Sequence, residues 1–257
     1  MTTPKVRTLY SQGSRFYVHP YDQDRKVPGV TSVLGMKPKG FLKYWAAKLV
    51  ATNAVENWEY VSQMIQADPE GAIDYLKRAP DRETKKAADQ GTGAHGIFEK
   101  MLLGQKIGPV VDNLLPFMRQ FEDLLKHVDI TPLRTEDTVW SDTHEYAGSF
   151  DVFAEVEGDR AWIDNKTTRS GIYDDVALQL SAYAHADYLL DGDTGEQLLL
   201  PQADIGLVFH VRPDFWAIYE PPIGEDVFEY FVALRKSFDW DRMSKGIIGK
   251  PVLKGEA

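Results

Sequence analysis

The hydrophobic pattern of this 257-residue chain changes character near residue 130, and this change constrains the fold more than any other feature. Before it, apolar residues recur every three to four positions, which indicates helices. After it, short runs rich in Val, Ile, Phe and Trp alternate in part with polar residues, which indicates strands. We therefore expect an α/β protein with a mainly helical part over residues 1–130 and a β-β-β-α-β-β-α core over 131–257. No linker separates them, so the sequence predicts a single domain over residues 1–257.

The spacing also predicts individual elements. Short extended pieces and turns are expected over residues 1–35, including Val30-Thr-Ser-Val33. The predicted helices span about residues 40–60, 68–78, 82–103, 111–128, 174–190 and 226–243. The predicted strands span 136–142, 147–156, 160–167, 204–211 and 215–220. Asp81 is the expected N-cap of the helix over 82–103, and Gly104 its expected stop.

Composition excludes several classes of protein. Hydrophobic residues make up 43% and charged residues 26% of the chain, which is ordinary for a globular protein. No window approaches 18 uninterrupted apolar residues, and the first residues lack the apolar core of a secretory signal, so we expect no membrane span and a cytoplasmic protein. Cysteine is absent, which excludes disulfides, thiolate zinc sites, iron–sulfur clusters and cysteine nucleophiles.

The charge is acidic overall but unevenly distributed. Lys and Arg total 29 against 39 Asp and Glu, a formal net charge of −10. Residues 37–48 nevertheless hold four lysines and no acidic residue, and residues 235–254 hold six basic residues against two acidic ones. Acidic proteins can bind phosphates when the negative charge is concentrated on metal ligands or far from the contact surface. Net charge therefore does not decide the partner.

Two aspartates are expected to meet on neighbouring strands. Side chains alternate along a strand, so Asp164 and Lys166 lie on the same face. On the preceding predicted strand, Asp151 lies on the face opposite Phe150. If these strands pair through the turn at 157–159, opposite residues have numbers that sum to about 316, which makes Asp151 and Asp164 cross-strand neighbours.

Close carboxylates repel each other unless a positive charge lies between them. Lys166 can supply that charge, which would leave a solvated salt bridge of little structural importance. A divalent cation is the other interpretation, because Mg²⁺ and Mn²⁺ prefer oxygen ligands.

Two predicted helices carry a polar residue in an otherwise apolar stripe. Gln179 lies in the stripe formed by Val176, Gln179, Tyr183, Ala186 and Leu190, where it must bond a polar group or lie half in water. His95 lies in the stripe formed by Ala88, Gly91, Ala94, His95, Phe98 and Leu102, where it is either a buried core histidine or a ligand. Glycines 91, 93 and 96 beside it indicate the close approach of another backbone or of a ligand.

Four motifs follow one another along the chain: Gly91-Thr-Gly-Ala-His95, Gly148-Ser-Phe-Asp151, Ile163-Asp-Asn-Lys166 and Gln179-Leu-Ser-Ala-Tyr183. In this order they resemble the motifs of the PD-(D/E)xK nuclease superfamily, in particular its RecB-type exonuclease branch found in phages. Segments 30–47 and 209–213 also resemble phage members, so the resemblance spans about residues 28–220. Phe150-Asp151 replaces the Pro-Asp of the superfamily's name. The chain has no cysteines for an iron–sulfur cluster and no P-loop for a nucleotide cofactor.

The resemblance implies a restriction-endonuclease-like core, with a central mixed sheet flanked by helices, and a set of site residues. His95, Asp151, Asp164 and the backbone carbonyl of Asn165 would bind one or two Mg²⁺ or Mn²⁺ ions. Lys166 would position the attacking water and stabilise the transition state, and Gln179 and Tyr183 would orient these groups.

Further residues are weaker candidates at this site. Glu99, one helical turn after His95, is either a supporting group or metal ligand, or an exposed partner of a nearby charge. Lys37, Lys39 and Lys43 either grip phosphates or form a solvated helix end. Thr167 and Thr168 are candidates for a phosphate hydrogen bond.

The implied activity is a metal-dependent DNA exonuclease that leaves 5′-phosphates, in phage-type replication, recombination or repair. A structure-specific or nicking endonuclease of the same fold and a non-catalytic nucleic-acid-binding recombination accessory protein remain alternatives. DNA is the expected partner and a membrane is not. A homo-oligomer, or a partner that anneals single strands in recombination, stays open.

Overall fold

The computed structural model describes residues 6–255 and divides the chain into two compact units. The larger unit comprises Met1–Lys37 and Ile97–Ala257, and the smaller unit comprises Pro38–Gly96. Helix α5 (Ala79–Leu102) contributes residues to both. Within residues 6–255, no helix combines the length and the apolar character that crossing a membrane requires.

A five-stranded mixed sheet forms the centre of the larger unit. Its strand order is β12-β11-β8-β7-β4, in which β8 and β11 are parallel and the other neighbours antiparallel. The strands are β4 (Ile130–Thr135), β7 (Val152–Val156), β8 (Asp159–Lys166), β11 (Ile205–Val211) and β12 (Trp216–Tyr219). The predicted α/β class with a mixed sheet flanked by helices is therefore confirmed.

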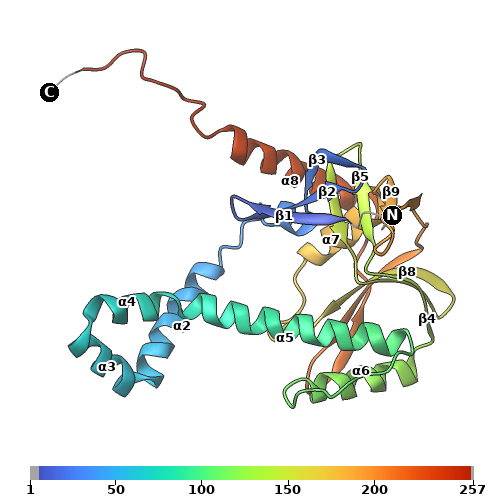
Figure 1. Cartoon of the computed structure of the whole chain (residues 1–257), viewed down its shortest axis with the longest axis horizontal. Helices are drawn as coiled ribbons and strands as arrows, with labels where there is room; N and C mark the ends of the chain where they lie inside the picture. The colour runs from blue at the N-terminus through green and yellow to red at the C-terminus, as the bar shows by residue number, and fades with distance from the viewer. Residues whose placement is uncertain (1–5, 256–257) are drawn as a thin grey trace. The chain divides into compact units, whose positions relative to one another are not determined.

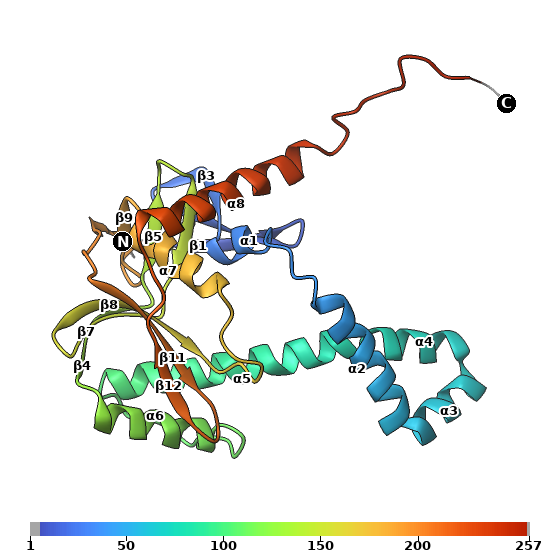
Figure 2. The same cartoon turned by 180° about the vertical axis from the view of Figure 1, so that it is seen from behind.

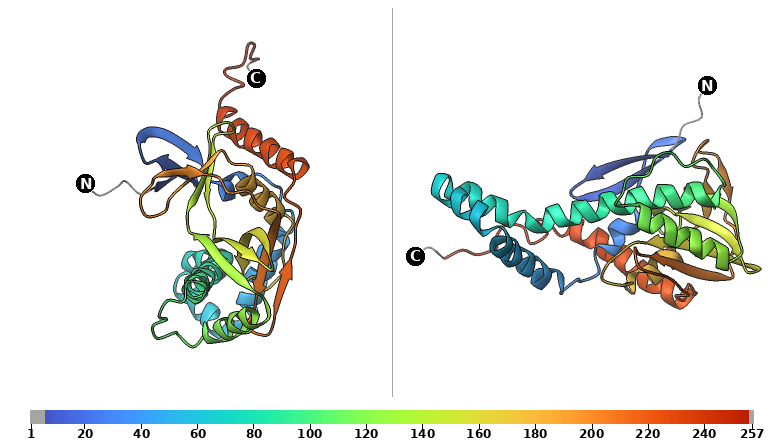
Figure 3. Two further views of the ribbon diagram at one scale, coloured as in Figure 1. Left: turned by 90° about the vertical axis from the view of Figure 1, so that its right-hand side faces the viewer. Right: turned by 90° about the horizontal axis from the view of Figure 1, so that it is seen from below.

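Helices cover both faces of this sheet. Helices α7 (Asp175–Ala184) and α8 (Glu225–Met243) lie on one side, and α6 (Leu115–His127) lies on the other, as Figures 1 and 2 show. Figure 3 shows α6 alongside the C-terminal part of α5, where the rings of Phe98 and Phe121 stack with centroids 4.2 Å apart. The short helix α1 (Val30–Leu34) packs against α7 and α8. Trp162 on β8 and Tyr183 on α7 belong to the same buried core.

Two smaller sheets complete the larger unit. One has the order β10-β9-β5-β6 and the other β1-β2-β3. Their strands are β1 (Arg7–Ser11), β2 (Ser14–His19), β3 (Asp22–Pro28), β5 (Thr138–Ser141), β6 (Tyr146–Ser149), β9 (Tyr188–Leu190) and β10 (Gln197–Leu199). A bridge between Gly29 and Ala147 connects the two sheets, which share a buried cluster around Tyr17 and Trp140.

The smaller unit is helical and buries little apolar surface. It contains α2 (Leu42–Glu56), α3 (Trp58–Ala67), α4 (Pro69–Lys77) and most of α5. The N-cap of α4 is Asp68, whose carboxylate accepts a hydrogen bond from the backbone N–H of Gly71 at 3.0 Å. The described residues of this unit include few buried apolar side chains, all of them small: Val61, Ala72, Ala79 and Ala94.

Several expected elements differ from the observed ones. The predicted strand over 147–156 is two strands, because β6 pairs with β5 whereas β7 pairs with β4 and β8. The predicted helix over 174–190 ends at Ala184, and its apolar end forms β9, since a short apolar run fits a buried strand as well as a helix. Val30–Leu34 is helical rather than extended.

Helix boundaries differ for local reasons. The segment 40–60 forms α2 and α3, separated at Asn57. Asp81 lies in the first turn of α5 rather than at its N-cap, because the helix begins at Ala79 and accommodates Pro80 where no N–H bond is needed. Gly104 follows the end of α5 with a φ of 62°, which confirms it as the stop.

Candidate functional site

The β7–β8 hairpin brings Asp151 and Asp164 together. Its two-residue turn, Glu157-Gly158, has positive φ angles of 52° and 97°, as this tight turn requires. The register runs from the pair Val156 and Asp159 to the pair Val152 and Ile163. Asp151 and Asp164 are the next residues on each side, and the carboxylate of Asp151 accepts a hydrogen bond from the backbone N–H of Asn165 at 2.7 Å. The predicted cross-strand proximity is confirmed.

Asp151 lies between two strands rather than on a continuous strand face, which corrects the sequence expectation. The backbone N–H of Phe150 donates to the carbonyl of Asp137 at 3.2 Å, and the N–H of Glu136 donates to the carbonyl of Asp151 at 3.3 Å. The buried ring of Phe150 packs edge-on against Trp162, with centroids 4.8 Å apart. Phe150 thus anchors the segment in the core, next to the aspartate.

Asp164 and Lys166 form a close ion pair at the end of β8. The ammonium of Lys166 lies 2.5 Å from Oδ2 of Asp164, and Asp164 is only 3% exposed. Burial lowers the pKa of Lys166, but the negative charges of Asp164 and Asp151 outweigh that effect and raise its pKa above the ordinary value. Lys166 is therefore protonated at neutral pH.

Helix α7 supports this pair through an amide and a phenol. The side-chain amide of Gln179 donates to Asp164 Oδ1 at 2.8 Å and to the hydroxyl of Tyr183 at 3.0 Å. The Tyr183 hydroxyl in turn donates to the carbonyl of Ser149 at 3.0 Å, and burial raises the Tyr183 pKa well above its ordinary value. The amide and the phenol, one helical turn apart, therefore tie α7 to β8 and to the end of β6, and the expected polar partner of Gln179 is Asp164.

Gly148 has a steric reason to be glycine. A Cβ atom there would lie 2.9 Å from Cε1 of Tyr183 and 2.9 Å from Cγ2 of Val30. These two neighbours come from α7 and α1, so the missing side chain allows both helices to approach β6.

Tyr17 supports the same segment and was missed by the sequence reasoning. The backbone N–H of Ser149 donates to its hydroxyl at 3.0 Å, and that hydroxyl donates to Ser149 Oγ at 3.3 Å. Tyr17 is 132 residues away in the chain and almost fully buried, so it looks like an ordinary core tyrosine in the sequence. No local pattern could have identified this contact.

His95 and Glu99 lie on α5 but in different units. His95 is half-buried in the smaller unit, and its role as a ligand stays a prediction. Glu99 belongs to the larger unit and accepts a hydrogen bond from Thr135 Oγ1 at 3.3 Å. Thr135 pairs with Val152, which follows Asp151, so Glu99 contacts the strand next to the site.

The apolar stripe of α5 that contains His95 is buried only in part. Ala94 and Phe98 are buried, but Ala88 is exposed. A Cβ atom at Gly96 would meet no atom within 4 Å among the described residues, so no other backbone packs there, and the close approach of a ligand stays a prediction.

The remaining candidates have varied surroundings. Lys37 pairs with Asp174, and this hydrogen bond holds the pKa of that carboxyl below its ordinary value. Lys39 and Lys43 are exposed in the smaller unit. Thr167 is half-buried, and Thr168 donates its hydroxyl hydrogen to the carbonyl of Gly171 at 2.7 Å. Because phosphodiester oxygens only accept hydrogen bonds, a phosphate contact from Thr168 would have to replace that bond.

The donor chemistry at Asp151 and Asp164 fits a hard divalent cation. Mg²⁺ is commonly bound through one or two carboxylates, with waters and substrate phosphates as the other ligands. Among residues 6–255, no three histidine, aspartate or glutamate side chains converge in a group that could hold a metal ion. Asp151, Asp164 and the adjacent Asn165 are the part of the predicted ligand set that the structure brings together in the larger unit.

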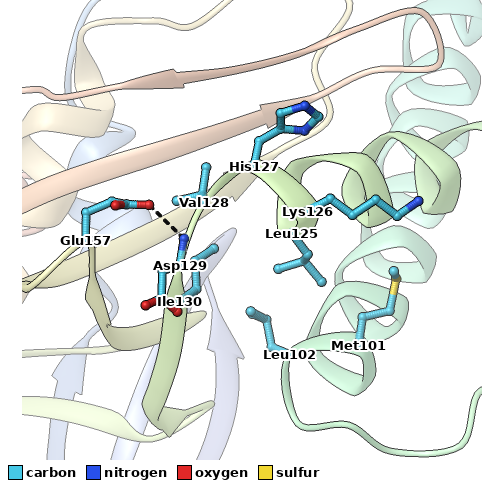
Figure 4. Close-up of a pocket in the computed structure, with 9 residues that line it drawn as sticks. All are labelled: Met101, Leu102, Leu125, Lys126, His127, Val128, Asp129, Ile130 and Glu157. Carbon is cyan, nitrogen blue, oxygen red and sulfur yellow. Dashed lines mark hydrogen bonds between the residues drawn. The ribbon is translucent and has the colours of Figure 1, made fainter.

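Two cavities lie in the larger unit at opposite ends of the β7 strand. One, of about 500 Å³, is lined by Glu99, Thr135 and Glu136 among others, next to the backbone that holds Asp151. The other, of about 510 Å³, lies near the hairpin turn, where the Glu157 carboxylate accepts a hydrogen bond from the N–H of Asp129 at 2.8 Å (Figure 4). Because the turn is at the far end of the hairpin from Asp151, this second cavity is separate from the carboxylate site.

Comparisons with known proteins do not identify a family or a function for this chain. A scan against protein-family models gives no match, and a search of curated proteins gives none. Among solved structures, the chain is similar to one described as "Crystal structure of SSO0001", with 14% sequence identity, a TM-score of 0.31, and coverage of 76% of this chain and 73% of that chain. A likeness this remote carries no argument about function.

Proposed function

We propose that this chain is a metal-dependent deoxyribonuclease that acts in the cytoplasm as a DNA exonuclease, hydrolysing phosphodiester bonds to leave 5′-phosphates. The observation that carries the proposal is the meeting of Asp151, Asp164 and Lys166 at one end of a hairpin. Two carboxylates beside a lysine whose protonated form they favour supply both a cation site and a fixed positive charge. A purely structural salt bridge needs only one of the two carboxylates.

Each side chain has a distinct part in this proposal. Asp151, Asp164 and the backbone carbonyl of Asn165 would hold Mg²⁺ or Mn²⁺, which would supply an activated water and neutralise charge on the scissile phosphate. The ammonium of Lys166 orients the water and stabilises charge that develops on the phosphoryl oxygens. Gln179 fixes the Asp164 carboxylate through its 2.8 Å hydrogen bond, and Tyr183 fixes Gln179.

The decisive experiment is a cleavage assay on four DNA substrates: linear and closed circular, each single- and double-stranded. Each is incubated with Mg²⁺, with Mn²⁺ or with EDTA. We expect degradation of linear DNA with either metal, no degradation with EDTA, and products that carry 5′-phosphates. Cutting of closed circles would instead favour an endonuclease, and no cleavage of any substrate would favour a non-catalytic binding protein.

Variants assign the activity to the site. Asp164→Asn and Lys166→Ala should each lower the cleavage rate by at least about 100-fold, because they remove a ligand or an electrostatic stabiliser. Glu155→Gln is the matched control, since Glu155 is an exposed carboxylate on β7 of the same hairpin. Circular dichroism should be unchanged in all three. Undiminished cleavage by Asp164→Asn would remove the assignment.

A further inference from the structure

The aromatic stripe at the start of α2 is exposed, although its spacing is typical of a buried helix face. Phe41, Tyr44 and Trp45 follow each other at intervals of three and one, so they lie on one side of the helix. They are 45%, 71% and 37% exposed, and α2 has no buried residue. Exposed aromatics grouped in this way indicate a surface that contacts a partner.

The same stretch is positively charged. Lys39, Lys43 and Lys48 are exposed, and no acidic residue occurs between positions 37 and 55. The ammonium of Lys43 lies 4.9 Å from the centroid of the Tyr44 ring, so charge and aromatic surface are adjacent. The partner that fits this surface is therefore negatively charged and has flat apolar groups.

Single-stranded DNA has both properties, because its bases are accessible for stacking and its phosphates are close by. A duplex hides its base faces, so it can use the lysines but not the rings. A membrane surface fits less well, since apolar residues occur on all sides of α2 rather than on one face, whereas membrane-surface helices are strongly amphipathic. A second copy of this helix would bring lysines against lysines.

We propose that the start of α2 binds single-stranded DNA, with Tyr44 and Trp45 stacking on bases and Lys43 and Lys48 contacting phosphates. This inference rests on the proposed function in taking DNA as the substrate, and it adds the form of DNA that is bound. Stacking is independent of base identity, so the surface has no strong sequence preference.

Binding is tested separately from cleavage. The protein is titrated into a labelled single-stranded oligonucleotide of about 20 nucleotides, long enough to span this surface, and into the matching duplex, both in EDTA, with fluorescence anisotropy as the readout. Tyr44→Ala and Trp45→Ala should each weaken single-strand binding by at least about fivefold, the lower end of base stacking on an aromatic ring. The dependence of log affinity on log salt should not change, because no charge is removed.

The charge variants should behave differently. Lys43→Gln combined with Lys48→Gln should reduce the slope of log affinity against log salt by about 1.4, since each lost phosphate contact of a single strand accounts for about 0.7. Tyr230→Ala is the matched control, because Tyr230 on α8 is 71% exposed like Tyr44 but lies outside the stripe. It should bind as the wild type does.

Three outcomes would overturn the inference and leave the proposed cleavage activity unaffected. The wild type does not bind the single strand, both aromatic variants bind it as the wild type does, or the aromatic variants lose as much affinity for the duplex as for the single strand. If Tyr44→Ala and Trp45→Ala bind the oligonucleotide normally but no longer bind vesicles of anionic lipid, the surface is assigned to a membrane. If they bind it normally but change from dimer to monomer, the surface is assigned to a second copy of the chain. Conversely, intact stacking-dependent binding without any cleavage would refute the proposed nuclease alone.

Discussion

At the scale of single residues, Lys166 is the side chain on which the site depends most. Burial opposes its charge, and the two neighbouring aspartates favour it. Since the folded-state pKa is raised, the charged lysine stabilises the fold fully below its ordinary pKa of 10.5, and this contribution is lost as the pH rises through the higher folded value. At neutral pH the site therefore keeps its positive charge.

Asp164→Asn should reverse the direction of this pKa shift. The substitution removes the largest favourable charge and leaves burial in place, so the Lys166 pKa should fall from above its ordinary value toward or below it. Titration of the lysine side chain by NMR measures this directly, with Glu155→Gln as the control. A Lys166 pKa that is the same in Asp164→Asn and the wild type would show that the pair is not coupled.

The meeting of Asp151 and Asp164 was predictable at this scale because a short turn fixes which residues face each other. Glu157-Gly158 is a local signal, and strand alternation then assigns every side chain. The contact between Tyr17 and Ser149 was not predictable, since it joins residues far apart in the chain and leaves no pattern in either segment.

At the scale of elements, α1, β6 and α7 meet where Gly148 has no side chain. Val30 comes from α1 and Tyr183 from α7, and both would lie 2.9 Å from an added Cβ. The same tyrosine continues to Gln179 and Asp164 by hydrogen bonds. Packing at Gly148 therefore controls the position of the carboxylate on β8.

Gly148→Ala should destabilise the protein by about 1–3 kcal/mol, the usual cost of overpacking a core, and should also lower activity because Tyr183 must move. Gly96→Ala is the control, since that position in α5 is open and alanine favours a helix by up to about 1 kcal/mol. Urea unfolding of both variants provides the measurement. Equal stability of Gly148→Ala and the wild type would contradict the steric account.

Element types were predicted better than their boundaries. Most helices and strands occur where periodicity indicates, but the end of the expected helix over 174–190 is β9, which pairs with β5. Tyr188 and Leu190 are buried in both interpretations, so burial alone cannot distinguish them. The pairing of β9 with β5, which is distant in the chain, makes this segment a strand, and the local sequence pattern carries no information about that pairing.

At the scale of the whole molecule, the two compact units were not apparent from the sequence, which predicts one domain. The chain passes between the units twice, after Lys37 and after Gly96. The second passage lies inside the uninterrupted helix α5, where no linker marks it. The exposed aromatic stripe of α2 was equally hidden, because its spacing is the same as that of a buried face.

Binding of a divalent cation at the carboxylates should stabilise the folded protein. Mg²⁺ at about 100 times its dissociation constant adds about 2.7 kcal/mol to the free energy of unfolding, which corresponds to a Tm increase of about 5–10 °C for a chain of this size. The increase should be lost with EDTA. Thermal unfolding followed by circular dichroism tests this without any nuclease assay.

Asp151→Asn is the informative variant for this measurement, and Glu155→Gln is again the control. The control should gain as much stability from Mg²⁺ as the wild type does, whereas Asp151→Asn should gain little. An identical Tm in Mg²⁺, Mn²⁺ and EDTA for the wild type would mean that the aspartate pair is not a cation site.

Strand β8 is hydrogen-bonded on both edges, antiparallel to β7 and parallel to β11. Its neighbours hold it in place, and its successive side chains point alternately toward α7 and away from it. Loss of a single residue from the middle of β8 would thus put the carboxamide of Asn165 in the layer that now holds the carboxylate of Asp164. A change of length in the turn at Glu157-Gly158, far from the aspartates, would leave that layer as it is, whereas a change of length inside the strand would not.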